Sequence, residues 1–459
     1  MSRRIICAHV GSTTIKSYSG KTIMCIAEKS ESLFHWEQEH IVGLSGSSRR
    51  NGLVFSKGKG CYLEDLEGRK YLDFTAGVGI MSVGHCHPRF VHAVQEQVGR
   101  LVGFHDATSK ARVELFQLLS MSLPERLGHF AMFSGGTETV EAALRFARVY
   151  TGRSSIIGFW GGFHGKTLGA MAVSGHDIIR RQWPLTIMEQ QLTIPYAYCY
   201  RCPLRLNRRD CNICCAEFGF KLIDQHCSVL PAAVIVEPMQ GTQGNIVPPK
   251  EFVQAISDWC RERGVILILD EILTGCARTG RMFAFEHYEV EPDILLLGKG
   301  LGAGYPVGIV VLSEELASHS KINCDSAASS SFGGNPVAAI AAKTTLEIIS
   351  EEDLMANANE VGRVLLHGCR ELQARHSLIG DVRGLGMLIG VELVKDRKSR
   401  DKATSESEAV VAAALRRGLL LMSSAAVLRI NPPLVLDDEQ AQTGLAILDE
   451  ALSDIESTM

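Results

Sequence analysis

The sequence predicts an α/β protein, with a mainly parallel sheet in a large domain and a smaller α+β domain. Short runs rich in Ile, Val and Leu alternate with amphipathic segments through the middle of the chain. Such runs are typical of strands that are buried on both faces. The chain has 459 residues, more than one hydrophobic core usually organises. After about residue 340 the alternation gives way to longer helical patterns and a strand pair.

The elements follow in order along the chain. The segment GCYLEDLEGRKYLDF (60–74) alternates apolar and polar residues around Glu67 and Gly68, which predicts a hairpin. HPRFVHAVQEQVGRL (87–101) has helical spacing. A long helix is expected near 335–375, then a strand pair in 379–394, another helix and the segment VLRINPPLV (427–435). The runs that predict strands are SSIIGF (154–159), AAVIVEP (232–238), GVILILDE (264–271), DILLLGK (293–299) and VGIVVL (307–312).

These patterns suggest a domain division. We expect an N-terminal extension at 1–45, the first part of the small domain with a linker at 46–104, the large domain at 105–340 and the rest of the small domain at 341–459. Residues 1–27 contain Arg and Lys but no Asp or Glu, so an organelle transit peptide is an alternative to a plain extension.

Bulk composition excludes some classes of function. The net charge of −4 gives no support for binding to nucleic acid or to a membrane surface, where a basic face would be expected. No run of about 18 apolar residues predicts a spanning helix. Fourteen cysteines in so long a chain fit reduced thiols, so we expect a cytoplasmic protein.

A lysine and an aspartate follow two of the predicted strands. Lys299 stands between Gly298 and Gly300 after DILLL, and Asp270 ends VILILD. Taken singly, they can be a lysine that reaches out to solvent and a capping carboxylate. Together, at the sheet edge where α/β proteins bind ligands, they fit a pyridoxal phosphate (PLP) site. The lysine would form a Schiff base, and the aspartate would keep the pyridine nitrogen protonated.

Two further segments supply the remaining parts of such a site. In SGGTETVEAALRFARVY (134–150), Gly135, Gly136 and Thr137 precede a helix, where free N–H groups and the helix dipole favour a phosphate. Ordinary capping by Thr137 is the alternative. In GGFHGKT (161–167), Phe163 can stack on a cofactor ring or fill the core.

Six blocks in this order resemble the class III aminotransferases, which are PLP enzymes of fold type I. The resemblance covers about residues 50–455 and implies a mainly parallel seven-stranded sheet. It also implies a homodimer with shared active sites, or a tetramer. The blocks are SGGTETVEAALRFAR, GGFHGKTLGAMAVSG, AAVIVEPMQG, the stretch from ILDEILTG to GAGYPVG, SSFGGNPVAA and VRGLGMLIGVELV.

The resemblance implies a role for each matching residue. Lys299 matches the Schiff-base lysine, whose freed amine then moves the substrate proton. Arg429 matches the arginine that binds a substrate carboxylate. Ser331 stands where the family usually has a threonine that reaches the partner's phosphate. The other matches are Asp270 on the pyridine nitrogen, Gly136 and Thr137 at the phosphate, and Phe163 on the ring.

Three positions depart from the common pattern. Thr242 replaces a glutamate that pairs with the carboxylate-binding arginine in ω-amino-acid enzymes. Leu273 replaces a glutamine near the phenolic oxygen of the cofactor and cannot make its hydrogen bond. Lys166 stands where arginine is commoner. These departures leave the cofactor residues intact and bear on the substrate.

Three functions compete. The first is an aminotransferase that moves an amino group from an amine or amino acid to a 2-oxo acid, pyruvate or 2-oxoglutarate, by a ping-pong cycle. The second is an amino-acid racemase or epimerase, or a dialkylglycine-type decarboxylase, on the same scaffold. The third is a non-catalytic metal-binding protein.

A cysteine-rich insertion lies at 195–217. Cys199, Cys202, Cys211 and Cys214 form two CxxC pairs that can hold zinc. Reduced cysteines that pack a rigid loop are the preferred interpretation, and a labile disulfide is a third. His85 and His87, two residues apart, have no third ligand nearby in the sequence, so no metal site is predicted there.

Overall fold

The computed structural model describes residues 30–43, 52–103, 107–177 and 191–459. The basic segment 1–27 lies outside them. The first described element, α1 (Ser30–His40), has no buried side chain. Among the helices of the described residues, none is long and apolar enough to cross a membrane.

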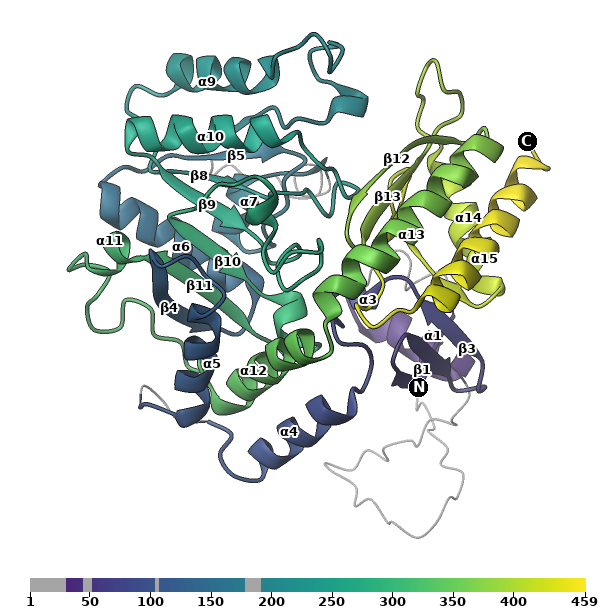
Figure 1. The fold of residues 1–459 in the computed structure, drawn as a ribbon, viewed down its shortest axis with the longest axis horizontal. Helices are drawn as coiled ribbons and strands as arrows, with labels where there is room; N and C mark the ends of the chain where they lie inside the picture. The colour runs from purple at the N-terminus through teal and green to yellow at the C-terminus, as the bar shows by residue number, and fades with distance from the viewer. Residues whose placement is uncertain (1–29, 44–51, 104–106, 178–190) are drawn as a thin grey trace, which may run out of the picture.

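The large sheet confirms all five predicted strands (Figure 1). Its order is β4-β11-β10-β9-β8-β5-β6, and β7 also pairs with β5. The expected seven strands become eight because β6 and β7 both pair with β5. Only β11 is antiparallel to its neighbours, which keeps the sheet mainly parallel. The strands are β4 (Leu127–Phe133), β5 (Ile156–Trp160), β6 (Ser174–Gly175), β7 (Gln191–Ile194), β8 (Ala233–Val236), β9 (Ile266–Asp270), β10 (Ile294–Leu297) and β11 (Gly308–Ser313).

Both faces of this sheet are buried, as its apolar runs predict. Successive residues of β9 alternate between two hydrophobic clusters. Leu267 and Leu269 share one cluster with Phe252 of α10 (Lys250–Arg263), while Ile266 and Ile268 share the other with residues of α6 (Gly136–Thr151). Because side chains alternate across a strand, helices must cover both faces. The other helices around this sheet are α5 (Lys110–Ser120), α7 (Leu168–Val173), α9 (Cys214–His226) and α11 (Glu314–Ala317).

The expectation of one long helix at 335–375 is wrong, because the chain forms two helices there. α12 (Pro336–Glu351) ends before α13 (Leu354–Arg375), and Asp353 between them has a left-handed φ of 50°. The break lets α12 pack on α4 and α5, while α13 packs on β12 and α15. Figure 1 shows this change of direction between the two parts of the molecule.

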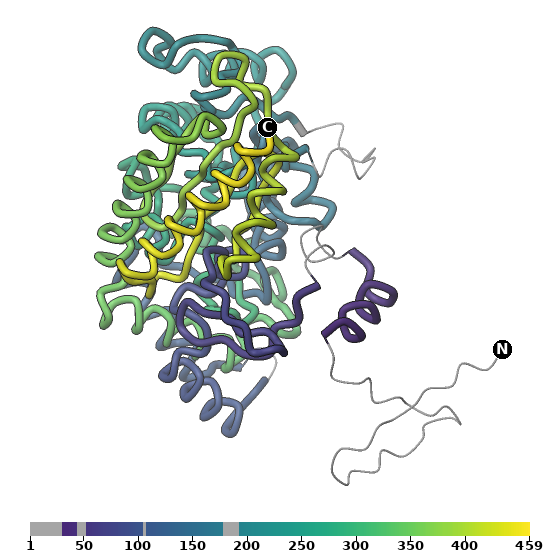
Figure 2. The backbone as a smooth tube through the Cα atoms, turned by 90° about the vertical axis from the view of Figure 1, so that its right-hand side faces the viewer, coloured from purple at the N-terminus to yellow at the C-terminus, as the bar shows by residue number. Residues whose placement is uncertain are grey.

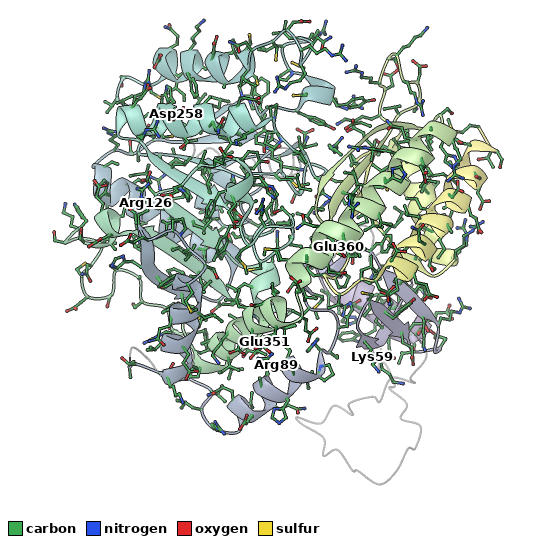
Figure 3. All side chains as sticks on the ribbon, in the orientation of Figure 1. Lys59, Arg89, Arg126, Asp258, Glu351 and Glu360 are labelled. Carbon is green, nitrogen blue, oxygen red and sulfur yellow. The ribbon has the colours of Figure 1, made fainter. Side chains whose placement is uncertain are left out.

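An ion pair fastens α12 to α4 (Pro88–Val98), the helix predicted at 87–101. Arg89 bonds to Glu351 and lies 3.0 Å from Glu347. Figure 3 shows Arg89 and Glu351 next to each other. The two histidines before α4 have different partners. Nε2 of His85 lies 2.8 Å from Asp73, and Nε2 of His87 lies 3.0 Å from Glu352.

The second part of the molecule joins distant segments. The predicted hairpin forms from β2 (Tyr62–Asp65) and β3 (Lys70–Asp73), and Gly68 in its turn has a φ of 82°. The strand β14 (Leu419–Leu420) pairs with β3, so the C-terminal segment extends the N-terminal sheet. Figure 2 shows the purple and yellow ends of the chain in the same part of the molecule. This pairing supports our proposal that 46–104, which also contains a linker, supplies the first part of the small domain that 341–459 completes.

The remaining elements complete the two small sheets and their cover. One sheet has the order β1-β2-β3-β14 and the other β12-β13-β16-β15. The elements not yet given are β1 (Phe55–Lys59), β12 (Ile379–Leu385), β13 (Leu388–Leu393), β15 (Met422–Ser424), β16 (Val427–Ile430), α3 (Ala76–Gly79), α14 (Thr404–Arg416) and α15 (Asp438–Glu456).

Candidate active site

Lys299 is the second residue after β10 and has a strained backbone. Its φ is 40°, in the left-handed region that a lysine rarely adopts. It opens the short 3₁₀ helix η3 (Lys299–Gly302), whose Gly300 carbonyl accepts a hydrogen bond from the hydroxyl of Ser82. Such a conformation costs about 1–3 kcal/mol and persists only where its surroundings hold it. Strain of this kind concentrates at functional sites.

Asp270 lies at the same edge of the sheet. It is the last residue of β9, and the strand register pairs it with Leu296, near the end of β10. Its side chain is buried. One carboxylate oxygen lies 2.7 Å from Nδ1 of His164, and the other accepts the backbone N–H of Ile272 at 3.1 Å. Asp270 is therefore held in place by groups of this chain.

The amino group of Lys299 is shifted toward its neutral form. Burial is the main reason that its pKa is lowered. The charges of Asp270 and Glu237 oppose this effect, and the charge of Arg429 adds to it. A neutral amine is the form that can act as a nucleophile or a base.

Sequence reasoning missed His164, although it lies in the quoted block GGFHGKT. Its imidazole is buried, and among the described residues no group hydrogen-bonds to its Nε2. Burial lowers the pKa of His164. The hydrogen bond to Asp270 and the negative charge of that carboxylate raise it by more than burial lowers it, so the pKa is raised overall. His164 and Asp270 are 106 residues apart in the sequence, so only the folded structure shows that they meet.

Glu237 was also missed, at the end of the quoted run AVIVE. Its two carboxylate oxygens accept the backbone N–H groups of Phe163, at 2.8 Å, and Gly241, at 3.1 Å. Burial raises its pKa to about 7. The charge of Glu237 reaches Lys299, His164 and Arg429. Its charge therefore acts on three other ionisable residues of the cluster.

Arg429 joins this cluster from the other domain. It lies on β16, opposite Gly390 of β13, and is buried. The described residues give it no ion pair, and its Nε has no hydrogen-bond partner. Burial lowers its pKa to about 10, and the charge of Glu237 opposes that shift. A buried guanidinium without a counter-ion is costly, so this geometry suits an anionic ligand.

An apolar patch lies next to Arg429. A Cβ atom added at Gly241 would be 2.0 Å from Cδ2 of Leu273 and 3.8 Å from Nη2 of Arg429. Leu273 packs with Met239 and Leu388 in a small hydrophobic cluster. Leu273, which stands where the family pattern has a hydrogen-bonding glutamine, thus contributes an apolar side chain next to the guanidinium of Arg429.

The start of α6 provides a cradle for an anion. Its N-cap is Gly135, so Thr137 does not cap the helix and its hydroxyl instead lies 2.9 Å from that of Thr167. The first N–H groups of a helix have no partner within the helix. A Cβ added at Gly136 would lie 3.0 Å from the side chain of Ile272, so a glycine keeps this corner open. Both observations suit a phosphate.

The two remaining predicted residues behave differently. Phe163 is partly buried, its N–H bonds to Glu237, and its ring meets that of His176 edge-to-face at 6.4 Å. Ser331 is exposed, and no hydrogen bond or ion pair in the described part of the chain links it to the cluster. The single chain therefore gathers every predicted site residue except Ser331 around one edge of the sheet.

These residues fit PLP. A lysine with a lowered pKa, a buried carboxylate and an open helix N-terminus match its aldehyde, its pyridine nitrogen and its phosphate. The Nε2 atom of His164 is a buried polar group that the described part of the chain leaves without a hydrogen bond.

The cysteine-rich insertion lies apart from this chemistry. Five cysteines line one narrow cavity of about 20 Å³, namely Cys199, Cys202, Cys211, Cys214 and Cys215. Among the described residues, no group of three or more His, Cys, Asp and Glu has the arrangement of a metal site, which gives the zinc hypothesis no support. Burial raises the pKa of Cys215 to about 12 and also raises that of Cys199, as expected for protonated, packed thiols.

The insertion instead braces the small domain. Tyr198 and Arg201 both bond to the buried carboxylate of Glu392 on β13. Arg383 lies 2.8 Å from the same carboxylate and donates to the carbonyl of Gly244. Since β13 pairs with β16, this network supports the strand that carries Arg429.

Comparisons with known proteins agree with this geometry. The sequence model described as aminotransferase class-III matches residues 45–452. A leucine/methionine racemase of Thermococcus litoralis is 34% identical over 88% of this chain and 91% of its own length. A probable 4-aminobutyrate aminotransferase of Bacillus subtilis is 33% identical over 91% and 97%. A PLP-bound amine transaminase from an uncultivated Pseudomonas species superposes with a TM-score of 0.85 at 28% identity, over 90% and 98% of the chains.

Proposed function

Because the chain belongs to the class-III aminotransferases, a family that depends on PLP, we propose that it transfers an amino group from an α-amino acid to a 2-oxo acid. Arg429 is the observation that carries the substrate class. It is buried, it lacks an ion pair among the described residues, and its charge reaches Lys299. A carboxylate close to the reacting amine would supply the missing counter-ion.

When bound, PLP supplies the carbonyl that accepts the amino group and the ring that takes up electrons from the substrate carbon. The Lys299 amine, whose pKa burial lowers toward the neutral form, would hold the cofactor and would then remove the proton from the substrate carbon. Asp270, which His164 holds in place, would keep a proton at the pyridine nitrogen. Gly136 and Thr137 would hold the phosphate, and Phe163 would pack against the ring.

We further propose a homodimer in which Ser331 reaches the partner's phosphate. The exposure of Ser331 in the single chain supports this proposal, because a partner subunit could contact it. Gel filtration with light scattering tests the dimer directly.

Racemisation is the second candidate, favoured by the similarity to the Thermococcus litoralis enzyme. A racemase delivers protons to both faces of the substrate carbon. Lys299 serves one face. The family model and the aminotransferases among the relatives favour transfer over racemisation.

A donor panel tests the proposal. The PLP-loaded enzyme is incubated with each amino acid, its D-enantiomer and the related amine, with pyruvate or 2-oxoglutarate as acceptor. Formation of a new amino acid from the acceptor supports transfer. Inversion of the donor without a new amino acid supports racemisation, and release of CO₂ supports decarboxylation.

A further inference from the structure

The cysteine-rich insertion is attached to the small domain at one buried carboxylate. The short 3₁₀ helix η1 (Cys199–Arg201) follows Tyr198 in the insertion. Tyr198 and Arg201 bond to opposite oxygens of Glu392, whose side chain is only 1% exposed. Burial opposes the ionisation of this carboxylate, but the charge of Arg383 and the bonds from Tyr198 and Arg201 outweigh burial, so its pKa is lowered. The insertion therefore binds an ionised group inside the small domain.

Arg383, on β12, connects this carboxylate to Gly244. Its Nη1 lies 2.8 Å from Glu392 and 2.6 Å from Asp381. Its guanidinium lies over the ring of Tyr198, 5.0 Å from the ring centre. The other two nitrogens, Nε and Nη2, donate to the carbonyl of Gly244 at 3.1 Å and 2.9 Å. Because a carbonyl oxygen has two lone pairs, Arg383 alone satisfies this acceptor.

The strand register places Gly244 between two arginines. Gly390 on β13 pairs with Arg383 on one side and with Arg429 on the other. Directly paired residues of neighbouring strands point to the same face of a sheet, so the two arginine side chains start on either side of Gly390. A Cβ atom added at Gly390 would lie 2.4 Å from the carbonyl oxygen of Gly244. The glycine therefore lets the segment 241–244 cross the sheet between the two arginines.

The segment 241–244 is held at both ends and lies next to the substrate site. The N–H of Gly241 donates to Glu237 at 3.1 Å, and the hydrogen bonds just described hold the carbonyl of Gly244. Within the segment, the N–H of Gly244 donates to the carbonyl of Gly241 at 3.0 Å. A Cβ atom added at Gly241 would be 3.8 Å from Nη2 of Arg429. Any shift of this segment would therefore change the space beside the guanidinium.

We propose that the cysteine-rich insertion is a specificity element of the substrate site. The insertion fixes the buried pair of Glu392 and Arg383. Arg383 in turn keeps the segment 241–244 in the position that leaves Arg429 open to a carboxylate. Arg383 and the bonding residues of the insertion are positioning residues, because they act through this segment. The inference rests on the proposed role of Arg429, and it assigns the insertion an effect on ligands that carry a carboxylate and none on amines that lack one.

The test uses PLP-loaded enzyme and three matched probes: an accepted α-amino acid, the amine that lacks its carboxylate, and the carboxylic acid that lacks its amino group. For alanine these are ethylamine and propionate. Arg383→Met removes both donors to Gly244, so KM for the amino acid and the inhibition constant of the acid should each rise about tenfold. Arg201→Met should raise both about threefold, because Arg383 still pairs with Glu392. The kcat for the amino acid and both constants for the amine should stay within about twofold.

A double variant tests whether the insertion acts through Arg383. Adding Arg201→Met to Arg383→Met should change KM by less than about twofold, because the pair that Arg201 supports is already broken. Independent effects would multiply to about thirtyfold and would overturn the inference. Tyr198→Phe keeps the ring next to Arg383 but loses the hydroxyl, so it should raise KM for the amino acid more mildly. Arg208→Met is the control and should change neither constant, since that side chain of the insertion pairs with the exposed Glu251 instead.

Further controls separate this inference from the function beneath it. Thermal unfolding and the visible absorbance of bound PLP show whether each variant is folded and loaded. If Arg383→Met does not fold, Tyr198→Phe decides, and an unchanged preference for the amino acid then overturns the inference. If Arg429→Met fails to reduce that preference, the role of Arg429 is wrong. If Arg429→Met acts as expected but Arg383→Met changes amine and amino acid equally, or changes neither, the inference about the insertion is overturned while the function stands.

Discussion

The two halves of the site differ in what they need from a ligand. In the cofactor half, consisting of Lys299, Asp270 and His164, the key carboxylate already has an imidazole at 2.7 Å and a backbone N–H at 3.1 Å. The substrate half consists of Arg429, Thr242 and Leu273. The guanidinium of Arg429 has no ion pair among the described residues, and Leu273 packs in a small apolar cluster. We propose that the first half is organised before a substrate arrives, whereas the second half is completed by the substrate.

Removing the lysine should break the cofactor half most severely. Lys299→Ala should lower kcat by at least about 10⁴-fold for every donor, because both the nucleophile and the base are lost. The visible absorbance of the bound cofactor should change as well. Steady-state rates and absorption spectra check this outcome, and Lys221→Ala on the exposed face of α9 is the control. Unchanged activity would contradict the assignment of Lys299.

Removing the guanidinium should affect only the substrate half. Arg429→Met should lower kcat/KM for α-amino acids by about 100-fold, since it removes a desolvated partner of a carboxylate. Rates with the matching amine should stay within about threefold. The control is Arg363→Met, at an exposed position on α13. A loss of equal size for amine and amino acid would remove the distinction between the two halves.

The charge of Glu237 acts on Lys299 in one half and on Arg429 in the other. Its effect should appear in the pH dependence of the free energy of unfolding. Its pKa is about 7 in the folded state and about 4.5 when unfolded, so the folded state binds the extra proton between these values. The stability contributed by this group is present below pH 4.5 and is lost as pH rises through 7, by up to about 3 kcal/mol. Relative to the parent, Glu237→Gln should therefore become more stable between pH 5 and pH 8.

Urea unfolding at each pH measures this difference, and Glu217→Gln on α9 should show none, because that carboxylate is exposed. Glu271 is also buried with a pKa of about 7, so the comparison must be the difference between parent and variant rather than the parent curve alone. A difference independent of pH would mean that Glu237 titrates alike in both states.

The smallest effects are expected at the cysteines of the insertion, which lie away from both halves. Cys215→Ser should cost about 1–2 kcal/mol of stability, because it buries a hydroxyl in an apolar setting. Cys199→Ser, at an exposed position, should cost less than about 0.5 kcal/mol. Purified protein should hold less than about 0.2 zinc per chain, whereas a structural site would be nearly full. Stoichiometric zinc that Cys199→Ser abolishes would restore the metal hypothesis.

The sequence was most informative about features that depend on one strand alone, namely the position of the strand and the polar residue at its end. Apolar runs with buried residues on both faces located β5, β8, β9, β10 and β11, and the polar residues after two of them located Lys299 and Asp270. His164 and Glu237 lay in segments already noted, but their importance depends on which strands lie side by side, and periodicity does not give the strand order. The break at Asp353 was missed because neither glycine nor proline marks it.

The half-reaction without an acceptor tests the central claim most directly. Enzyme loaded with PLP is mixed with an α-amino acid in the absence of any 2-oxo acid, and the oxo acid formed from the donor is counted against active sites. Transfer through Lys299 predicts one oxo acid per site followed by a halt, and Lys299→Ala should form none. Continued conversion of the donor to its enantiomer, with no oxo acid released, would contradict the account.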